Sequence, residues 1–451
     1  MSVSTYIPVP EFYAGKSVFI TGGAGYLGKV LLEKLLYSCP KVDKIYLLLR
    51  DKKNVNAQQR LHTIINLPIF SRLRKERPQD LDKIVVLKGD IGVQNLNMKT
   101  EDLETVIEKV SVVIHSAASV KFNDPLKISL NINLEGTRNV LNLCHLIKNL
   151  RVFIHISTVY CNSDKKVIEE IVYPPPVSEE EALRFVDKWA KDKAETTKFL
   201  NGKPNSYTFT KALAEHLVAE TQGDIPAVII RPSIVTPSKD EPVKGWVDNW
   251  YGATAGLTAI AKGVIRAIYT TDDHVLDLIP VDYVCNLTLV AGARAKRQAE
   301  VAVYNSCSGS TNPITMKEII NKYIETSLKN KFNDLPYPYL MLRSKRYWLV
   351  KTIHMMMMSI AYLADMLNRL TMKRPRYTKL VTQAVMVANL LEFFTSNSLI
   401  SKSEKAEALF YTLSPTDART FPCLASDINW KDYLPIYFQG VKKYLIEKKI
   451  M

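Results

Sequence analysis

A tyrosine and a lysine four residues apart, Tyr207 and Lys211, are the side chains best suited to chemistry in this sequence. Pro204-Asn-Ser marks a helix start just before them, and residues four apart on a helix share one face. The phenol and the ammonium should therefore point the same way. A nearby cation lowers the pKa of a phenol from its usual value of about 10. We predict that Tyr207 donates or accepts a proton and that Lys211 lowers the pKa of Tyr207.

The segment His155-Ile-Ser-Thr-Val-Tyr160 supplies hydroxyl groups at the end of a predicted strand. Either Ser157 or Thr158 could hold the oxygen of a substrate carbonyl beside Tyr207. Spacing alone does not choose between them, and we favour Thr158 as the catalytic group. His155 is interpreted as a packed strand residue and not as a base.

A glycine-rich turn, Thr21-Gly-Gly-Ala-Gly-Tyr-Leu-Gly28, lies between a predicted strand and an amphipathic helix. Glycines at this place let the backbone turn sharply and approach a pyrophosphate, which then sits at the helix N-terminus. A lone glycine motif is weak evidence, but the strand–turn–helix setting strengthens it. The expected cofactor contacts here are Thr21, Gly22, Gly25, Tyr26, Leu27 and Gly28.

The next predicted strand ends in Arg50, about 20 residues beyond the glycines. An acidic residue at this place binds the ribose of NAD, whereas an arginine accommodates the 2′-phosphate of NADP. Arg50 therefore favours NADPH, although the adjacent Asp51 could instead face the ribose. Further contacts are expected where the third and fourth strands end, and Lys211 should reach the nicotinamide ribose. The strand-end contacts are Asp90 and Ile91 for adenine, and Ser116 and Ala117 for ribose.

Together these groups predict hydride transfer to or from a carbon–oxygen bond. The cofactor would supply the hydride, Tyr207 the proton, and a hydroxyl the stabilisation of developing negative charge. No metal ion is required or signalled.

The elements that must position these groups alternate along the chain from Lys16 to about Ala293. Short apolar runs alternate with helical patterns, which is typical of an α/β fold with a doubly wound parallel Rossmann sheet covered on both faces. The predicted strands are Ser17–Ile20, Lys44–Leu49, Ile84–Lys88, Val112–His115, Val152–Ile156 and Ala227–Ile230.

Strand signals fade after about Asn312, and Leu, Met, Lys and Tyr dominate the remainder. We therefore predict a nucleotide-binding and catalytic domain over residues 14–312, a linker over 313–345 and a helical C-terminal domain over 346–451. The most apolar window, Tyr347–Leu367, is interrupted by Lys351, His354 and Asp365. It is compatible with a core helix, with an amphipathic helix facing a membrane or substrate, or with a membrane span.

Bulk composition restricts the partners. The formal net charge is +15, which favours anionic partners such as phosphorylated cofactors, coenzyme A or anionic lipid. No nucleic-acid motif is present, so nucleic acid is not expected as a partner. The six cysteines are scattered without C-x-x-C spacing, which argues against a zinc site or a disulfide framework. The N-terminus lacks the pattern of a signal peptide, so we expect the active face to be cytosolic.

Longer segments resemble the fatty acyl-CoA reductases, especially insect members of the pheromone-gland type, within the extended short-chain dehydrogenases. The matching segments cover nearly the whole chain. They include the glycine turn with Ile45-Tyr-Leu-Leu-Leu-Arg50, Val113-Ile-His-Ser-Ala-Ala-Ser-Val-Lys-Phe122, Asn133-Leu-Glu-Gly-Thr-Arg138, Asn205-Ser-Tyr-Thr-Phe-Thr-Lys211, Gly245-Trp-Val-Asp-Asn-Trp-Tyr-Gly252 and Asp427-Ile-Asn-Trp430.

The resemblance implies that two NADPH reduce a long-chain acyl-CoA to the primary alcohol through an aldehyde. It also implies peripheral membrane contact at the cytosolic face of the endoplasmic reticulum or at peroxisomes. Two alternatives remain at this stage. One is an extended short-chain dehydrogenase acting on another carbonyl substrate, and the other is a Rossmann binding protein without catalysis. Oligomeric state and chain-length preference do not follow from the sequence.

Overall fold

Seven parallel strands form the central sheet of the computed structural model, which describes residues 6–52, 54–189, 192–330 and 341–447. The spatial order is β11-β7-β5-β4-β1-β2-β3. The strands are β1 (Ser17–Thr21), β2 (Ile45–Leu49), β3 (Ile84–Lys88), β4 (Val110–His115), β5 (Val152–Ile156), β7 (Ala227–Pro232) and β11 (Ala302–Ser306). The predicted α/β class and parallel Rossmann sheet are confirmed.

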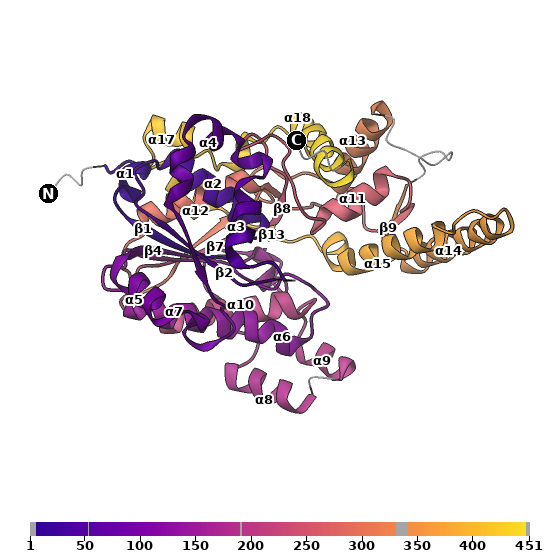
Figure 1. Cartoon of the computed structure of the whole chain (residues 1–451). Coiled ribbons are helices and arrows are strands. Elements are labelled where there is room, and N and C mark those ends of the chain that lie inside the picture. Colours follow the sequence, from indigo (N-terminus) through magenta and orange to yellow (C-terminus); the bar gives the residue numbers. More distant parts are fainter. Residues whose placement is uncertain (1–5, 53, 190–191, 331–340, 448–451) are drawn as a thin grey trace.

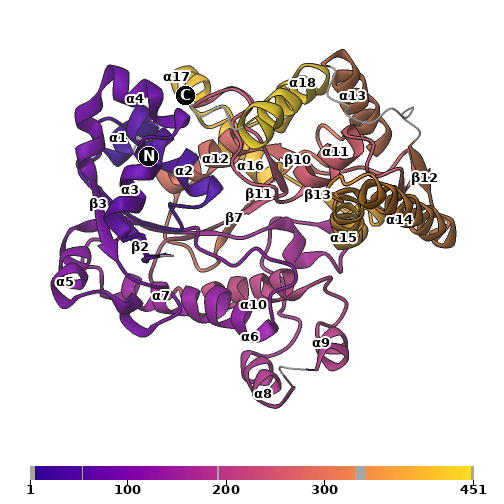
Figure 2. The ribbon, with the colours of Figure 1, turned by 45° about the vertical axis from the view of Figure 1, so that its right-hand side comes forward.

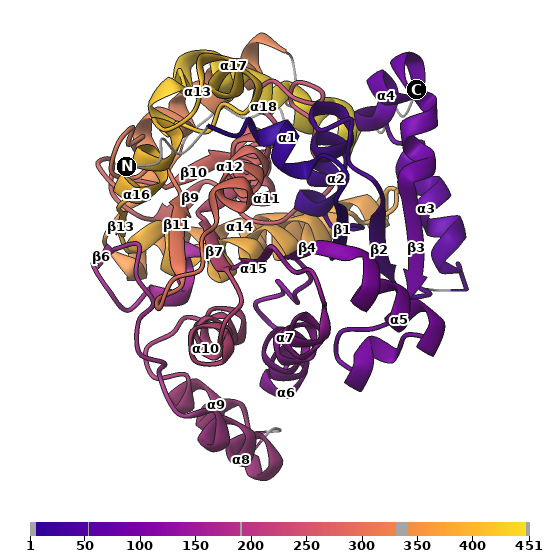
Figure 3. The same cartoon turned by 90° about the vertical axis from the view of Figure 1, so that its left-hand side faces the viewer.

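Helices cover both faces of this sheet (Figure 3). Side chains alternate along each strand, so in β1 Val18 and Ile20 face one apolar core while Phe19 faces the other. The first core includes α2 (Tyr26–Ser38) and α12 (Val281–Arg294). The second includes α5 (Thr100–Lys109), α7 (Gly136–Leu146) and α10 (Ser206–Thr221).

The remaining elements extend this framework. Short pairs of parallel strands are β8 (Ile234–Thr236) with β10 (Leu278–Pro280), β9 (Ala267–Tyr269) with β12 (Leu342–Ser344), and β6 (Val167–Ile168) with β13 (Ile400–Ser401). Further helices are α1 (Val9–Tyr13), α3 (Ala57–Ile65), α4 (Ser71–Glu76), α6 (Leu126–Leu130), α8 (Glu179–Trp189), α9 (Lys193–Phe199), α11 (Ala253–Ala261), α13 (Met316–Lys329), α14 (Tyr347–Leu370), α15 (Tyr377–Ser396), α16 (Glu404–Phe410), α17 (Pro415–Thr420) and α18 (Trp430–Gly440).

The C-terminal part is helical, as predicted, but it does not stand apart from the sheet. Phe421 belongs to the same apolar core as α2, and α18 packs with α11 and α13 in a third core. The contact is close at one point, because a Cβ at Gly440 would lie 1.8 Å from the carbonyl oxygen of Gly245. The segment 313–345, expected as a linker, contains the packed helix α13, and its residues 331–340 lie outside the described part of the chain.

Helices α14 and α15 form an antiparallel hairpin that projects from the body of the molecule (Figures 1 and 2). The carboxylate of Asp365 ties the two helices together by accepting the backbone N–H groups of Arg376, Tyr377 and Thr378 at 2.7–3.0 Å. Lys351 pairs with Glu392 at 3.2 Å. Within the described ranges, no helix combines the length and the apolar character needed to cross a bilayer.

Candidate active site

The glycine turn joins β1 to α2 in a space that admits no side chains at two of its positions. Gly22 has φ +75°, and a Cβ there would lie 2.5 Å from the backbone nitrogen of Ala117. A Cβ at Gly28 would lie 2.3 Å from the carbonyl oxygen of Gly22. No side chain caps the N-terminus of α2, so its first backbone N–H groups are left to bind an anion. This cradle fits the pyrophosphate of a dinucleotide.

The side chains expected to contact the cofactor around this turn have other partners. Thr21 is fully buried, and its Oγ1 lies 2.7 Å from Nδ1 of His115. The Tyr26 hydroxyl donates to the carbonyl oxygens of Thr236 and Trp246 at 3.0 and 3.1 Å, and Leu27 packs between two apolar cores. These contacts of the three residues hold the turn in place.

Ser116 and Ala117 follow β4 and lie against the glycine turn. The N–H of Ser116 donates to the carbonyl of Thr21 at 3.2 Å, and that of Ala117 to Oγ1 of Thr21 at 3.3 Å. The pairing of Thr21 with His115 in the sheet brings these strand ends together. The expected contacts from β1 and β4 therefore share one edge of the sheet.

Arg50 lines an open pocket of about 820 Å³ at the ends of β2 and β3 (Figure 3 shows these strands). Its guanidinium lies 3.3 Å from the carboxylate of Asp90. The carboxylate of Asp51 is engaged by other groups, because it accepts from Lys88 at 2.6 Å and from the backbone N–H of Ala57 at 3.0 Å. Ile91 is buried beneath the pocket region, against the second core. Arg50 thus reaches into the pocket with a side chain that is 60% exposed, whereas Asp51 is held by Lys88 and Ala57.

Lys211 lies on α10 beneath the end of β5. Its ammonium donates to the carbonyl oxygen of Ile156 at 2.6 Å and lies 3.3 Å from Nε2 of His155. Burial lowers the pKa of Lys211 to about 8, although the Glu215 carboxylate and the Cys161 thiol oppose this shift. Burial also lowers the pKa of His155, and Lys211 adds to that effect, so His155 stays neutral as a packed strand residue.

Tyr207 stands one helical turn before Lys211 on the same face of α10. Burial raises the pKa of the phenol above its usual value, and the Cys161 thiol and Glu215 carboxylate add to the rise. The nearby hydroxyl of Thr158 works in the opposite direction. The expected lowering of the Tyr207 pKa is therefore wrong in direction. The phenol keeps its proton at neutral pH, as a proton donor in a reduction must.

The hydroxyls of Ser157 and Thr158 point to different groups. Thr158 lies near enough to Tyr207 to lower the pKa of the phenol, and its hydroxyl donates to the carbonyl oxygen of Pro232 at 3.3 Å. Ser157 lies near Glu215 and lowers the pKa of that carboxyl, and its Oγ lies 3.9 Å from Sγ of Cys161. Both residues are buried. Thr158 is consequently the hydroxyl beside the phenol, and Ser157 belongs to the support behind it.

That support is a buried ion pair which the sequence did not reveal. Arg231 on β7 donates to both carboxylate oxygens of Glu215 on α10, at 2.8 and 2.6 Å. Burial alone would raise the pKa of Glu215, but the guanidinium holds it below its usual value. Arg231 also donates to the carbonyls of Glu169 and Ile171. The pair locks α10 against the sheet and so fixes the position of Tyr207.

Asn133 is a second residue whose role the sequence did not show. It lies in a single π-helical turn, Asn131–Glu135, between α6 and α7. Its amide donates to Oγ1 of Thr210 at 3.0 Å and to the carbonyl of Ser119 at 3.1 Å, and its oxygen accepts from the N–H of Ser119 at 2.8 Å. A buried asparagine inside a helical pattern is the signal that could have drawn attention to it.

Comparisons with known proteins agree with this geometry. Residues 20–288 match an NAD-binding family model described as "Male sterility protein", and residues 356–448 match a second model of the same description. Fatty acyl-CoA reductase 1 of Xenopus laevis is 37% identical over 454 residues, which cover 98% of this chain and 87% of that protein. The human protein of the same name is 36% identical over the same shares of both chains. Fatty acyl-CoA reductase 2 of Bos taurus is 33% identical over 98% of this chain and 86% of its own length.

Solved structures support the fold. The reductase domain of a non-ribosomal peptide synthetase from Mycobacterium tuberculosis gives a TM-score of 0.65 at 17% identity, covering 98% of this chain and 94% of that one. The terminal R domain from the myxalamid pathway gives 0.64 at 19% identity over 97% and 92%. The UDP-glucuronic acid 4-epimerase of Bacillus cereus, solved with NAD, gives 0.55 at 17% identity over 95% and 97%. Residues 20–288 therefore form a Rossmann domain that binds a nicotinamide cofactor.

Proposed function

Because the chain belongs to the fatty acyl-CoA reductase family, we propose that it reduces a long-chain acyl-CoA to the primary fatty alcohol and free CoA with NADPH. The observation that carries the proposal is the nearness of Thr158 to Tyr207, close enough for its hydroxyl to lower the pKa of the phenol. It brings together a proton donor and an oxygen-holding hydroxyl at the strand edge that also carries the glycine cradle. A binding protein has no need of this pair.

The nicotinamide cofactor supplies a hydride to the acyl carbon in each of two reductions. Thr158 holds the carbonyl oxygen, Tyr207 gives its proton to the oxygen as negative charge develops, and Lys211 positions the cofactor ribose. The first reduction gives a hemithioacetal, which expels CoA and leaves an aldehyde. The same side chains serve the second reduction. One acyl-CoA and two NADPH, with two protons, thus give one alcohol, one CoA and two NADP⁺.

The test is to incubate the purified protein with NADPH and palmitoyl-CoA and to measure alcohol, free CoA and NADPH. We expect two NADPH per alcohol, and we expect Tyr207→Phe to lose reduction while it still binds NADPH. Accumulation of aldehyde with one NADPH consumed would contradict the alcohol product. NADPH binding without turnover of any acyl-CoA would favour a catalytically silent binding protein, and turnover of another carbonyl alone would favour a different dehydrogenase.

The choice of NADPH over NADH is supported by Arg50, whose guanidinium is 60% exposed in the pocket at the ends of β2 and β3. Its neighbour Arg60, on α3, donates to the backbone carbonyl of Arg50 and adds positive charge. We expect Arg50→Asp to raise the KM for NADPH and to leave that for NADH nearly unchanged. Equal effects on both cofactors would contradict recognition of the 2′-phosphate by Arg50.

Peripheral membrane contact is the second part of the proposal, and the outer face of α14 supports it. The three polar residues that interrupt the window Tyr347–Leu367 face inward or toward α15, where each has a partner. The outward face is apolar, and the turn that follows it is basic, which suits an anionic bilayer surface. The cytosolic face of the endoplasmic reticulum, or the peroxisome, remains the proposed location. The exposed apolar side chains include Trp348, Met355, Met356, Ile360, Leu363, Leu367, Leu370 and Met372; the cations of the turn are Lys373, Arg374 and Arg376, and Lys379 follows in the first turn of α15.

A further inference from the structure

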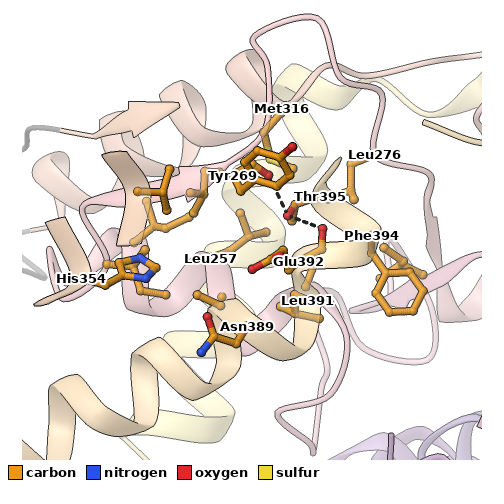
Figure 4. Close-up of a pocket in the computed structure, with 18 residues that line it drawn as sticks. Leu257, Tyr269, Leu276, Met316, His354, Asn389, Leu391, Glu392, Phe394 and Thr395 are labelled. Atoms are coloured by element: carbon orange, nitrogen blue, oxygen red, sulfur yellow. Dashed lines mark hydrogen bonds between the residues drawn. The ribbon is translucent and has the colours of Figure 1, made fainter. Parts of the chain in front are cut away.

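An apolar pocket of about 690 Å³, a volume that includes space open to solvent, lies where the α14–α15 hairpin joins the body of the molecule (Figure 4). Helices α11 and α15 line the pocket with residues at helical spacing. Ala253, Gly256, Leu257 and Ile260 come from α11, and Ala388, Leu391, Glu392 and Thr395 come from α15.

The polar side chains of this pocket are engaged by neighbouring groups. Glu392 accepts from Lys351 at 3.2 Å, and Thr395 donates to the carbonyl of Tyr269 at 3.2 Å. Nε2 of His354 donates to the carbonyl of Ala267 at 2.9 Å. Nδ1 of the same ring has no partner among the described residues, so an alkyl group beside it would break no hydrogen bond. The space is therefore suited to hydrocarbon.

Aromatic rings connect one end of the pocket to the reacting groups. Phe394 lines the pocket and stacks on Phe122 with centroids 5.3 Å apart. Phe122 in turn stacks on Tyr207 at 6.2 Å. His354 lies at the opposite end of the labelled side chains in Figure 4. A chain whose carbonyl carbon lies beside Tyr207 would thus pass these two rings before it enters the pocket.

We propose that this pocket holds the distal methylenes of the acyl chain, and that the side-chain volumes at Leu257, Val350 and Ala388 set the longest chain that is reduced efficiently. Phe122 and Phe394 flank the carbons nearest the reacting carbonyl. The inference rests on the proposed acyl-CoA reduction. It assigns the pocket to the hydrocarbon tail of that substrate.

Burial of each methylene favours binding by about fourfold. Because binding energy from remote parts of a substrate is used in the transition state, the effect should appear in kcat/KM. The test therefore compares kcat/KM across saturated acyl-CoA substrates from octanoyl to eicosanoyl, at concentrations below micelle formation.

Two substitutions should move this profile in opposite directions. We expect Ala388→Phe, which fills the pocket, to lower kcat/KM for palmitoyl- and stearoyl-CoA by roughly tenfold or more, the loss of two or three methylene contacts. Octanoyl-CoA should be nearly unaffected. Leu257→Ala, which enlarges the pocket, should shift the optimum toward longer chains. Met386→Phe, at an exposed position on the same helix, is the matched control and should leave the profile unchanged.

The outcomes separate this inference from the function on which it rests. Reduction of acyl-CoA by the wild type with the same chain-length profile in all three variants would overturn the pocket assignment alone. An equal loss at every chain length in both pocket variants would also overturn it, because that pattern reports a structural defect. Failure of the wild type to reduce any acyl-CoA would refute the proposed function itself.

Discussion

Ser157 and Thr158 are adjacent in the chain, yet their hydroxyl groups serve different partners. The hydroxyl of Thr158 lies near Tyr207 and lowers the pKa of the phenol, whereas that of Ser157 lies near Glu215 and lowers the pKa of the carboxyl. In an extended segment, successive side chains point to opposite sides, and Thr158 has extended backbone angles of φ −157° and ψ 146°. This alternation separates the two roles, although either hydroxyl satisfied the sequence pattern.

Replacing each hydroxyl in turn tests this division. We expect Thr158→Val to lower kcat by about 10²–10³-fold, the usual cost of removing one donor to a developing oxyanion, with the melting temperature little changed. Ser157→Ala should retain most activity and lose about 1 kcal/mol of unfolding free energy. Steady-state kinetics and urea unfolding measure both effects. The reverse pattern would assign catalysis to Ser157.

The pKa of about 8 for Lys211 predicts an alkaline limb in the pH profile. Lys211 carries its charge below this pH and loses it as the pH rises through about 8. The raised pKa of Tyr207 keeps the phenol protonated over that range. We therefore expect kcat/KM, which reports groups of the free enzyme, to fall above about pH 8.

Lys211→Arg is the control for this assignment, because a guanidinium stays charged throughout. Whatever its absolute activity, the variant should lack the alkaline limb. A limb that persists unchanged in Lys211→Arg would assign it to another group.

At the scale of elements, the Glu215–Arg231 pair holds helix α10 against strand β7. Both side chains are buried, so removal of one charge leaves the other without compensation. We expect Glu215→Gln to cost about 3–5 kcal/mol of unfolding free energy, measured by urea denaturation. Glu195→Gln, which breaks the exposed pair with Lys198, should cost less than about 1 kcal/mol. Similar losses in the two variants would show that the buried pair is not structurally special.

Six strands of the central sheet could be predicted because each is a short apolar run beside a turn signal. The seventh, β11, has the sequence Ala-Val-Tyr-Asn-Ser, and its apolar pattern is too weak to indicate a strand. Its place at the sheet edge depends on pairing with β7, which is a tertiary contact. Helix α13 was missed for a related reason, since the Pro-containing stretch after it suggested a linker.

Within the site, the glycine turn and the Tyr207–Lys211 pair could be predicted because their chemistry depends on local spacing. The support by Arg231 could not, because it lies 16 residues from Glu215 along the chain and on a different element. The same limit applies to the apolar pocket, whose walls come from α11, α14 and α15. Local spacing also assigned Thr21 and Tyr26 to the cofactor, whereas their side chains have structural partners.

At the scale of the whole molecule, the projecting hairpin predicts reversible binding to anionic membranes (Figure 1). Met355, Leu363 and Leu367 are each more than half exposed on one face of α14, and burial of such side chains favours insertion into the interface. We expect the protein to co-sediment with vesicles that contain phosphatidylserine, and to do so less as salt increases.

The triple variant Met355→Glu, Leu363→Glu and Leu367→Glu should lose vesicle binding by tenfold or more and keep its activity on soluble octanoyl-CoA. Replacement of Val167, Ile171 and Leu328 by Glu is the control, because these apolar side chains are also exposed but do not belong to α14 or α15. Equal loss in both variants would contradict a specific membrane face.

The N-terminal segment of the described chain is tied to Asp417, whose carboxylate accepts from the backbone N–H of Val9 at 2.8 Å and from the hydroxyl of Tyr6. Asp417 also lies 3.9 Å from the guanidinium of Arg294. During translation, α1 leaves the ribosome long before Asp417 is synthesised. The contacts of the N-terminal segment are therefore completed only after Asp417 has been synthesised and has left the ribosome. Ribosome-bound nascent chains that stop short of residue 417 should accordingly be more sensitive to protease near α1 than the released protein.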